Sequence, residues 1–148
     1  MMLDWLFSDP LPAGSPAPDF TALDDSGNSV TLSALRGRNV VLVFYPGDDT
    51  PGCTKQLCDF RDRWDQAKAK KVAVYGVNPQ SAARHTKFRN KFKFPFPLIV
   101  DEDRAIAKLY NADGLIVKRT VYLIGRDGVI RFAQRGMPSP TEVLEHAA

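Results

Sequence analysis

The sequence contains few of the residues on which common cofactor and metal sites depend. Its 148 residues include only two cysteines and two histidines, without the spacing of metal ligands. It has no glycine-rich phosphate loop, and no apolar run approaches the ~20 residues that a membrane-spanning helix needs. The net charge of +3 comes from interspersed acidic and basic residues, with no basic stripe. These absences argue against a metal, a nucleotide cofactor, a membrane span or a nucleic acid.

The length and composition are those of one globular domain. With 44% hydrophobic and 25% charged residues, a chain of this length has enough apolar side chains to bury a core. We predict one domain over 1–148, in which residues 1–13 form a short N-terminal arm, or alternatively an interaction segment. The arm does not resemble a signal peptide, because Asp4 interrupts a short apolar stretch that no basic residue precedes. We therefore expect a cytoplasmic protein, in which a lasting disulfide is rare.

Both cysteines lie in one strand–loop–helix segment. The apolar run 39–45 predicts a buried strand, which the prolines, glycines and aspartates of 46–52 bring to an end. A helix reaching to about residue 70 is then predicted by apolar side chains at steps of four and three. These side chains are Cys53, Leu57, Phe60, Trp64 and Ala67. Cys53 is therefore expected near the first turn of the helix, facing the protein body.

Helix geometry limits what the two cysteines do together. Five residues along a helix correspond to a rotation of roughly 140° and a rise of about 7.5 Å, so the Cα atoms of Cys53 and Cys58 would be about 8.7 Å apart. A disulfide needs roughly 4.4–6.8 Å. Pairing would therefore require this part of the helix to unwind, which suits a transient redox pair better than a permanent crosslink.

A reactive Cys53 would need help to ionise. A free thiol, with a pKa of about 8.5, is only about 3% thiolate at pH 7. Lowering this pKa to about 6, so that the thiol is mostly ionised at pH 7, needs roughly 3.4 kcal/mol of stabilisation of the thiolate relative to the thiol. The positive end of a helix supplies only about 0.3–1 kcal/mol, and burial opposes ionisation. A cation from elsewhere in the chain is therefore expected beside Cys53.

The pattern Pro46-x-x-x-Thr50-x-x-Cys53 resembles the active-site signature of the peroxiredoxins. The longer run 48–54, followed by Cys58, resembles the bacterioferritin comigratory protein (Q-type) branch of this AhpC/TSA family. The similarity extends from about residue 14 to 140 and includes segments 14–20, 74–77, 94–98 and 119–124. It implies a thioredoxin-like fold with a central mixed β-sheet flanked by helices.

Periodicity alone predicts only the α/β class. It predicts strands at 39–45, 72–77, 97–100, 120–124 and 129–132 and helices at 53–70, 81–92, 104–110 and 140–148.

The resemblance also implies a function, a thiol-dependent peroxidase that reduces hydrogen peroxide and organic hydroperoxides. In this interpretation Cys53 becomes a sulfenic acid and then forms an intramolecular disulfide with Cys58. An external dithiol, thioredoxin above all, reduces the disulfide. The branch further implies a monomer that needs no metal, haem or flavin.

Three further residues acquire roles through the resemblance. Thr50, otherwise a helix cap, would bind a peroxide oxygen, and Pro46, otherwise a turn residue, would shield the thiolate. Arg119, otherwise a surface arginine, matches the family's arginine position and is our candidate for the missing cation. The family often has glutamate where this chain has Gln56, which supplies no charge. Elsewhere, we expect His85 on an exposed helix face and Tyr45 and Trp64 in the core.

Two other functions remain open from the sequence. A disulfide oxidoreductase of the thioredoxin type would want Cys-x-x-Cys, whereas this chain has four residues between its cysteines. A non-catalytic binding or chaperone module on the same fold would leave Cys53 inert. The rate at which peroxide consumes the thiols separates these possibilities.

Overall fold

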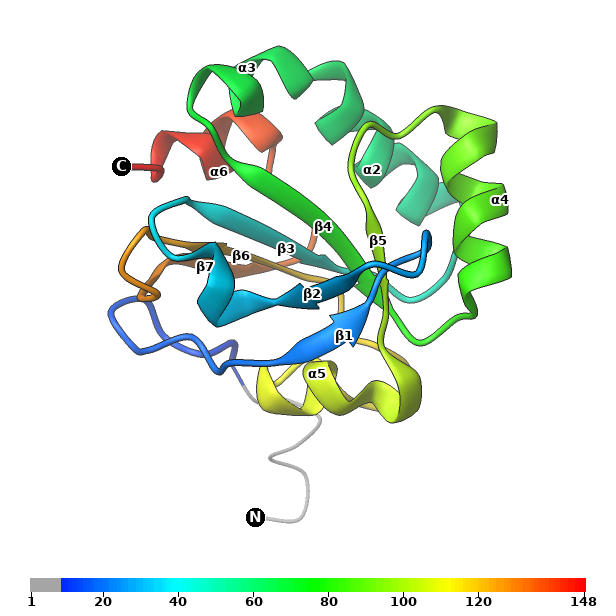
Figure 1. Ribbon diagram of the computed structural model, residues 1–148, viewed down its shortest axis with the longest axis horizontal. Helices are drawn as coiled ribbons and strands as arrows, with labels where there is room; N and C mark the ends of the chain where they lie inside the picture. Colours follow the sequence, from blue (N-terminus) through cyan, green and yellow to red (C-terminus); the bar gives the residue numbers. More distant parts are fainter. Residues whose placement is uncertain (1–8) are drawn as a thin grey trace.

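A five-stranded mixed sheet forms the centre of the protein (Figure 1). The structure, a computed structural model, describes residues 9–148. The strands lie in the order β5, β4, β3, β6, β7. They span Val40–Phe44 (β3), Ala73–Asn78 (β4), Leu98–Val100 (β5), Thr120–Ile124 (β6) and Ile130–Arg135 (β7). β3, β4 and β5 run parallel to one another, whereas β6 pairs antiparallel with both β3 and β7.

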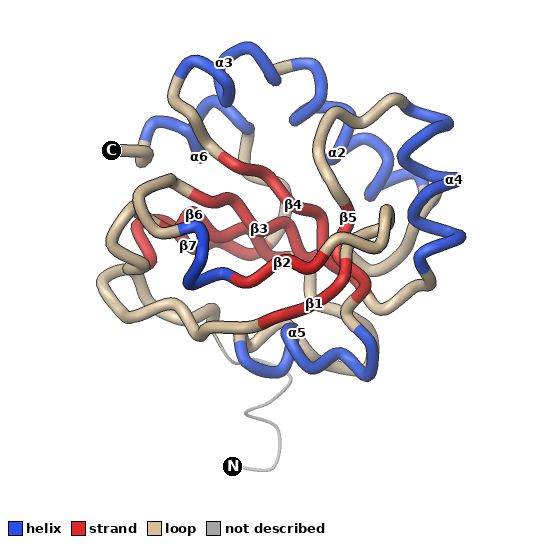
Figure 2. The backbone as a smooth tube through the Cα atoms, viewed as in Figure 1, coloured by secondary structure: helices blue, strands red, loops and turns tan. Residues whose placement is uncertain are grey.

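Helices and a small hairpin cover the two faces of this sheet (Figure 2). Every residue of β3 and β6 is buried, as expected for strands that are covered on both sides. One face packs against α2 (Pro51–Asp62), α3 (Trp64–Ala69), α4 (Ala82–Phe92) and α6 (Pro140–Glu145). The other packs against the hairpin of β1 (Thr21–Leu23) and β2 (Ser29–Thr31), a 3-10 turn at Leu32–Leu35 and α5 (Ala105–Leu109). The predicted α/β architecture, with a central mixed sheet and flanking helices, is confirmed.

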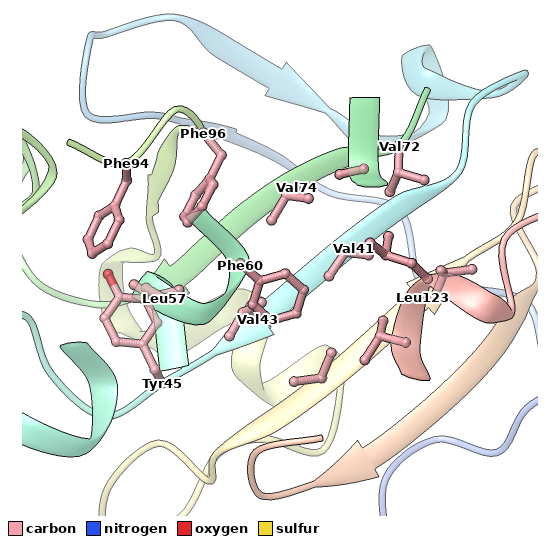
Figure 3. Packing of buried hydrophobic residues seen from close by; sticks show 14 of the residues in the cluster. Val41, Val43, Tyr45, Leu57, Phe60, Val72, Val74, Phe94, Phe96 and Leu123 are labelled. Atoms are coloured by element: carbon pink, nitrogen blue, oxygen red, sulfur yellow. The ribbon is translucent and has the colours of Figure 1, made fainter. Parts of the chain in front are cut away.

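The packing of α2 on the sheet fixes the direction in which Cys53 points. Leu57 and Phe60 are 0% and 2% exposed and lie over the valines of β3 and β4 (Figure 3). Cys53 belongs to the same buried cluster, one helical turn before Leu57. The prediction that Cys53 faces the protein body is therefore confirmed.

The helix that contains both cysteines is shorter than predicted. We expected it to continue to about residue 70, but α2 ends at Asp62 and α3 begins at Trp64. Arg63 between them leaves the helical conformation, with φ −103° and ψ 18°. Beyond this bend the Trp64 ring packs against Phe96, with ring centroids 6.0 Å apart. The apolar spacing continues through the bend, which is why periodicity alone does not reveal it.

The helix α4 begins where its cap predicts but buries a residue that we expected to be exposed. The Ser81 hydroxyl accepts a hydrogen bond from the Arg84 backbone N–H, which confirms Ser81 as the N-cap. The expectation of an exposed His85 is wrong, because this side chain is 0% exposed. Burial is tolerated because both ring nitrogens have partners, the Asp48 carboxylate and the Ile99 backbone carbonyl.

Residues 9–13 are the described part of the predicted N-terminal arm, and residues 1–8, including Trp5, lie outside the described residues. The Leu11 backbone N–H donates to the Tyr122 hydroxyl at 2.9 Å, and the Leu11 side chain packs against the second apolar cluster. Within residues 9–148, no helix is long and apolar enough to cross a bilayer.

Candidate active site

The pairing of β3 with β6 brings two distant segments of the chain to one place. The register sets Phe44, the last residue of β3, opposite Thr120, the first residue of β6. Arg119 therefore lies beside the point where the chain leaves β3 for the loop 45–50 and helix α2. The sheet register thus brings Cys53 and Arg119, 66 residues apart in sequence, into contact.

Cys53 is the third residue of α2, which begins at Pro51. The first intrahelical bond runs from the Thr54 N–H to the Thr50 carbonyl at 2.8 Å, so the N–H groups of Gly52 and Cys53 precede the helical ladder. Such groups, together with the helix dipole, favour negative charge at this end of the helix. The Cys53 side chain is only 1% exposed, so negative charge on its sulfur would be largely desolvated.

The guanidinium group of Arg119 bridges two side chains of α2. Its Nη2 donates to the Cys53 Sγ at 3.3 Å, and its Nη1 donates to the Gln56 Oε1 at 2.8 Å. The Gln56 Nε2 in turn donates to the backbone carbonyl of Gly136 at 3.3 Å. The backbone N–H of Gly136 also donates a hydrogen bond to the backbone carbonyl of Arg119 at 2.9 Å. The cation expected beside Cys53 is thus present and held in place from both sides.

Gln56 has a role that the sequence left open. A glutamate here would hold Arg119 with a charge but would also point a carboxylate at the Gly136 carbonyl. The amide instead accepts from Arg119 and donates to Gly136, so both ends of the side chain are satisfied. Because Gln56 is buried and uncharged, it orients Arg119 without neutralising it. Sequence reasoning missed Gly136 altogether, because its contribution comes from the backbone.

Gly52 leaves space for the arginine. A Cβ atom at this position would lie 3.2 Å from the Arg119 Nη2, closer than nine in ten real Cβ contacts. Any larger residue would therefore press on the nitrogen that contacts Cys53. This is a packing reason for the glycine directly before the cysteine.

Thr50 and Pro46 flank the loop that precedes α2. Thr50 occupies the N-cap position, but its hydroxyl donates to the Gly47 carbonyl at 3.0 Å and does not cap the helix. This bond folds the loop back on itself and leaves the Thr50 side chain exposed. Pro46 is half-buried and lies two residues after the end of β3. Their predicted contacts with peroxide stay predictions.

Cys58 lies in the same unbroken helix as Cys53, and both cysteines are reduced. It is half-buried and packs at the edge of the apolar cluster that contains Cys53. Burial raises the pKa of the Cys58 thiol, Arg61 opposes this effect, and the carboxylates of Asp62 and Asp59 add to it. Cys58 is therefore held as a thiol in this state, whereas Cys53 faces a cation.

The metal-ligating residue types do not gather around this site. Within residues 9–148, no group of three or more histidine, cysteine, aspartate or glutamate side chains is arranged to hold a metal ion. The polar groups that surround Cys53 are instead a guanidinium group, an amide and backbone N–H groups.

Comparison with known proteins shows the family to which the chain belongs. The model of the AhpC/TSA family matches residues 13–133. The chain belongs to the AhpC/TSA family. It is 40% identical over 131 residues to a protein of rice (Oryza sativa subsp. indica) named putative peroxiredoxin Q, chloroplastic, and covers 60% of that protein's length. It is 41% identical over 126 residues to the putative peroxiredoxin bcp of Coxiella burnetii, with 79% of this chain and 83% of the relative covered.

Solved structures of this AhpC/TSA branch have the same fold. Peroxidoxin BcpB from Mycobacterium tuberculosis matches with a TM-score of 0.86 and 28% identity, over 92% of this chain and 96% of that one. Peroxiredoxin Q of Xanthomonas campestris matches with a TM-score of 0.82 and 27% identity, over 88% and 91% of the two chains. The resemblance to the Q-type branch and the thioredoxin-like fold that it implied are therefore confirmed. The chain spans about 60% of the length of the plant relatives.

Proposed function

We propose that the protein is a thiol-dependent peroxidase whose attacking group is the Cys53 thiolate. The observation that carries this proposal is the 3.3 Å contact between the Arg119 Nη2 and the Cys53 Sγ at the start of α2. A guanidinium group and the helix N-terminus both favour the thiolate, which is the nucleophilic form of cysteine. Family membership supports the same chemistry.

In the first step, the sulfur of Cys53 attacks one oxygen of the hydroperoxide. An S–O bond forms as the O–O bond breaks, so that Cys53 is oxidised to a sulfenic acid. The peroxide is reduced to water or an alcohol after its leaving oxygen takes up a proton. Arg119, Thr50 and the free N–H groups at the start of α2 would stabilise the negative charge on that oxygen, while Pro46 screens the thiolate from water.

In the second step, Cys58 attacks the sulfenic sulfur of Cys53. An S–S bond forms and the S–O bond breaks, with release of water. Because both cysteines lie in one continuous helix, their Cα atoms are about 8.7 Å apart until the helix unwinds. The resolving step therefore includes local unfolding of α2, which also exposes Cys58 and removes the burial that raises its pKa.

An external dithiol would restore the thiols by disulfide exchange, and thioredoxin is the partner we propose. The substrates are hydrogen peroxide and organic hydroperoxides. The dependence on a dithiol fits a cytoplasmic protein. We further propose that a monomer carries out the cycle, because both cysteines come from one helix.

Thiol counting tests this function. Reduced protein is mixed with one equivalent of hydrogen peroxide, and free thiols are counted over seconds. The proposal predicts rapid loss of both thiols and a mass decrease of two hydrogens. Loss at the rate of free cysteine would contradict it and would favour an inert Cys53.

A further inference from the structure

The loop that carries Pro46 and Thr50 takes part in a buried polar cluster. At its centre is Asp48, only 4% exposed. The Asp48 Oδ1 accepts hydrogen bonds from the Tyr45 hydroxyl at 2.6 Å and the Asn78 Nδ2 at 3.1 Å. The Asp48 Oδ2 lies 2.6 Å from the His85 Nδ1. The Asp48 backbone N–H donates to the side-chain carbonyl of Gln80. One loop residue thus contacts both β4 and α4.

The backbone fixes which nitrogen of His85 carries hydrogen. The His85 Nε2 lies 2.9 Å from the Ile99 carbonyl, which only accepts hydrogen bonds, so Nε2 carries a hydrogen. The Nδ1 forms the second hydrogen bond of the ring, with the Asp48 Oδ2 at 2.6 Å. Burial and the charge of Asp48 raise the pKa of the Tyr45 hydroxyl, so this group stays a donor to Asp48. Each polar atom of the Asp48 and His85 side chains therefore has a partner.

The cluster joins the loop to elements other than α2. His85 lies in α4, Ile99 in β5 and Asn78 at the end of β4. Next to Asp48, Asp49 forms a second contact with α4, to the Lys91 Nζ at 2.8 Å. The conformation of the loop between β3 and α2 is therefore set by α4 and the sheet, and not only by the helix that follows it.

We propose that Asp48 and His85 are positioning residues for peroxide reduction, holding the loop of Pro46 and Thr50 in place over Cys53. This inference rests on the proposed peroxidase function and adds two residues to it. Thiolate formation depends on Arg119 and the start of α2, and within residues 9–148 the side chains of Asp48 and His85 form no hydrogen bond or ion pair with Arg119 or Cys53. Placement of the peroxide depends on the loop, because Thr50 and Pro46 are attached to it. Displacement by about 1 Å is enough to cost roughly 100-fold in rate.

This separation of roles gives a test with two reagents. In a Cys58→Ser background, Cys53 is reacted with hydrogen peroxide and, separately, with iodoacetamide. Alkylation needs the thiolate but no peroxide site. Asp48→Ala, which removes every side-chain bond of the cluster centre, is expected to slow the peroxide reaction at least tenfold. The alkylation rate is expected to stay level or rise as the loop loosens.

Two variants complete the series. Asp48→Asn should largely restore the peroxide rate, because an amide still accepts from Tyr45 and Asn78 and donates to the Nδ1 of a neutral His85. His85→Leu keeps similar bulk but loses the bonds to Asp48 and Ile99, so it should resemble Asp48→Ala. It also gives a second measurement if Asp48→Ala does not fold, as judged by circular dichroism.

The matched control is Asp25→Ala. Asp25 is another buried carboxylate that holds α4, with both oxygens 3.2 Å from the Arg89 Nη1, but it makes no contact with the active-site loop. It should lower stability without changing the ratio of peroxide to alkylation rates. An unchanged ratio in folded Asp48→Ala or His85→Leu would overturn the positioning role alone. A parent that reacts with peroxide no faster than free cysteine would overturn the peroxidase proposal and this inference with it.

Discussion

At the scale of single residues, Arg119 contacts the sulfur of Cys53 and the amide of Gln56 with different nitrogen atoms of one guanidinium group. A lysine could not make both contacts in the same geometry, because its ammonium group is a single point charge on a flexible chain. The fork is held from behind by Gln56 and by the Gly136 N–H on the Arg119 carbonyl. The site thus presents a fixed cation to the Cys53 sulfur.

Arg119→Met is expected to slow the reaction of Cys53 with hydrogen peroxide by about 100- to 1,000-fold. Methionine keeps much of the bulk but removes the positive charge that stabilises the thiolate and the leaving oxygen. Rates measured against pH separate these effects, because loss of ionisation alone is recovered at high pH. Arg131→Met is a matched control, since Arg131 is exposed and pairs only with Asp127 in the described contacts. Full recovery at high pH would leave Arg119 no part in polarising the peroxide.

In the proposed cycle Cys58 carries out the second step, and it should give that step a distinct pH dependence. Because burial raises its pKa, Cys58 stays a thiol to higher pH than a free cysteine while α2 is folded. The attacking form is the thiolate, and Cys58 loses its burial when α2 unwinds, so disulfide closure should accelerate as pH rises from about 6 to about 9, across the ordinary cysteine pKa of about 8.5. Closure is followed by mass after rapid acid quench. A closure rate that is flat over this range would contradict the assignment.

Serine variants separate the two cysteines. Cys53→Ser should abolish peroxide reduction. Cys58→Ser should keep one rapid reaction with peroxide and then stop, because no intramolecular disulfide forms. Turnover of Cys58→Ser with thioredoxin at the wild-type rate would show that Cys58 is not the required resolving residue.

At the scale of elements, α2 holds Cys53 in position and, while it is intact, keeps Cys53 and Cys58 too far apart for the proposed disulfide. Leu57 and Phe60 are almost fully buried in the cluster below the helix. Exposing both would cost roughly 3–6 kcal/mol at about 1.5–3 kcal/mol per side chain. The reduced state therefore favours the intact helix strongly, and only formation of the S–S bond is expected to hold it open.

Oxidation should unwind the first turns of α2. Amide hydrogen exchange is expected to accelerate at residues 54–61 in the disulfide form, and the fluorescence of Trp64 should change as its side of the cluster loosens. A Trp5→Phe variant removes the second tryptophan signal. Identical exchange in both redox forms, with the disulfide confirmed by mass, would contradict the geometric argument.

The sequence predicts some features of these elements correctly and misses others. The buried strand before Cys53, the start of α2 and the cap at Ser81 depend on local patterns, and these predictions were confirmed. The break at Arg63 was missed because the apolar spacing runs through it. His85 was misplaced because its partners, Asp48 and Ile99, are 37 and 14 residues away in sequence. Its position three residues before Phe88 was the one local signal that it faces inward.

At the scale of the whole molecule, the redox state should change stability. Unwinding part of α2 removes apolar packing, and a disulfide across so few residues constrains the unfolded chain only slightly. The oxidised protein is therefore expected to melt at a lower temperature than the reduced protein, by several degrees for each roughly 1–2 kcal/mol lost. Cys58→Ser, treated in the same way, is the control for effects of peroxide that do not involve the disulfide. An equal or higher melting temperature for the disulfide form would contradict this expectation.

We propose above all that this fold turns Cys53 into a nucleophile that reacts rapidly with peroxide. The most direct measurement is the second-order rate constant of the Cys58→Ser protein with hydrogen peroxide, obtained by rapid mixing at neutral pH beside free cysteine. The arrangement of Arg119, Thr50 and the start of α2 predicts a rate at least about a thousandfold above that of free cysteine. A rate equal to that of free cysteine, in a folded and fully reduced sample, would contradict the account.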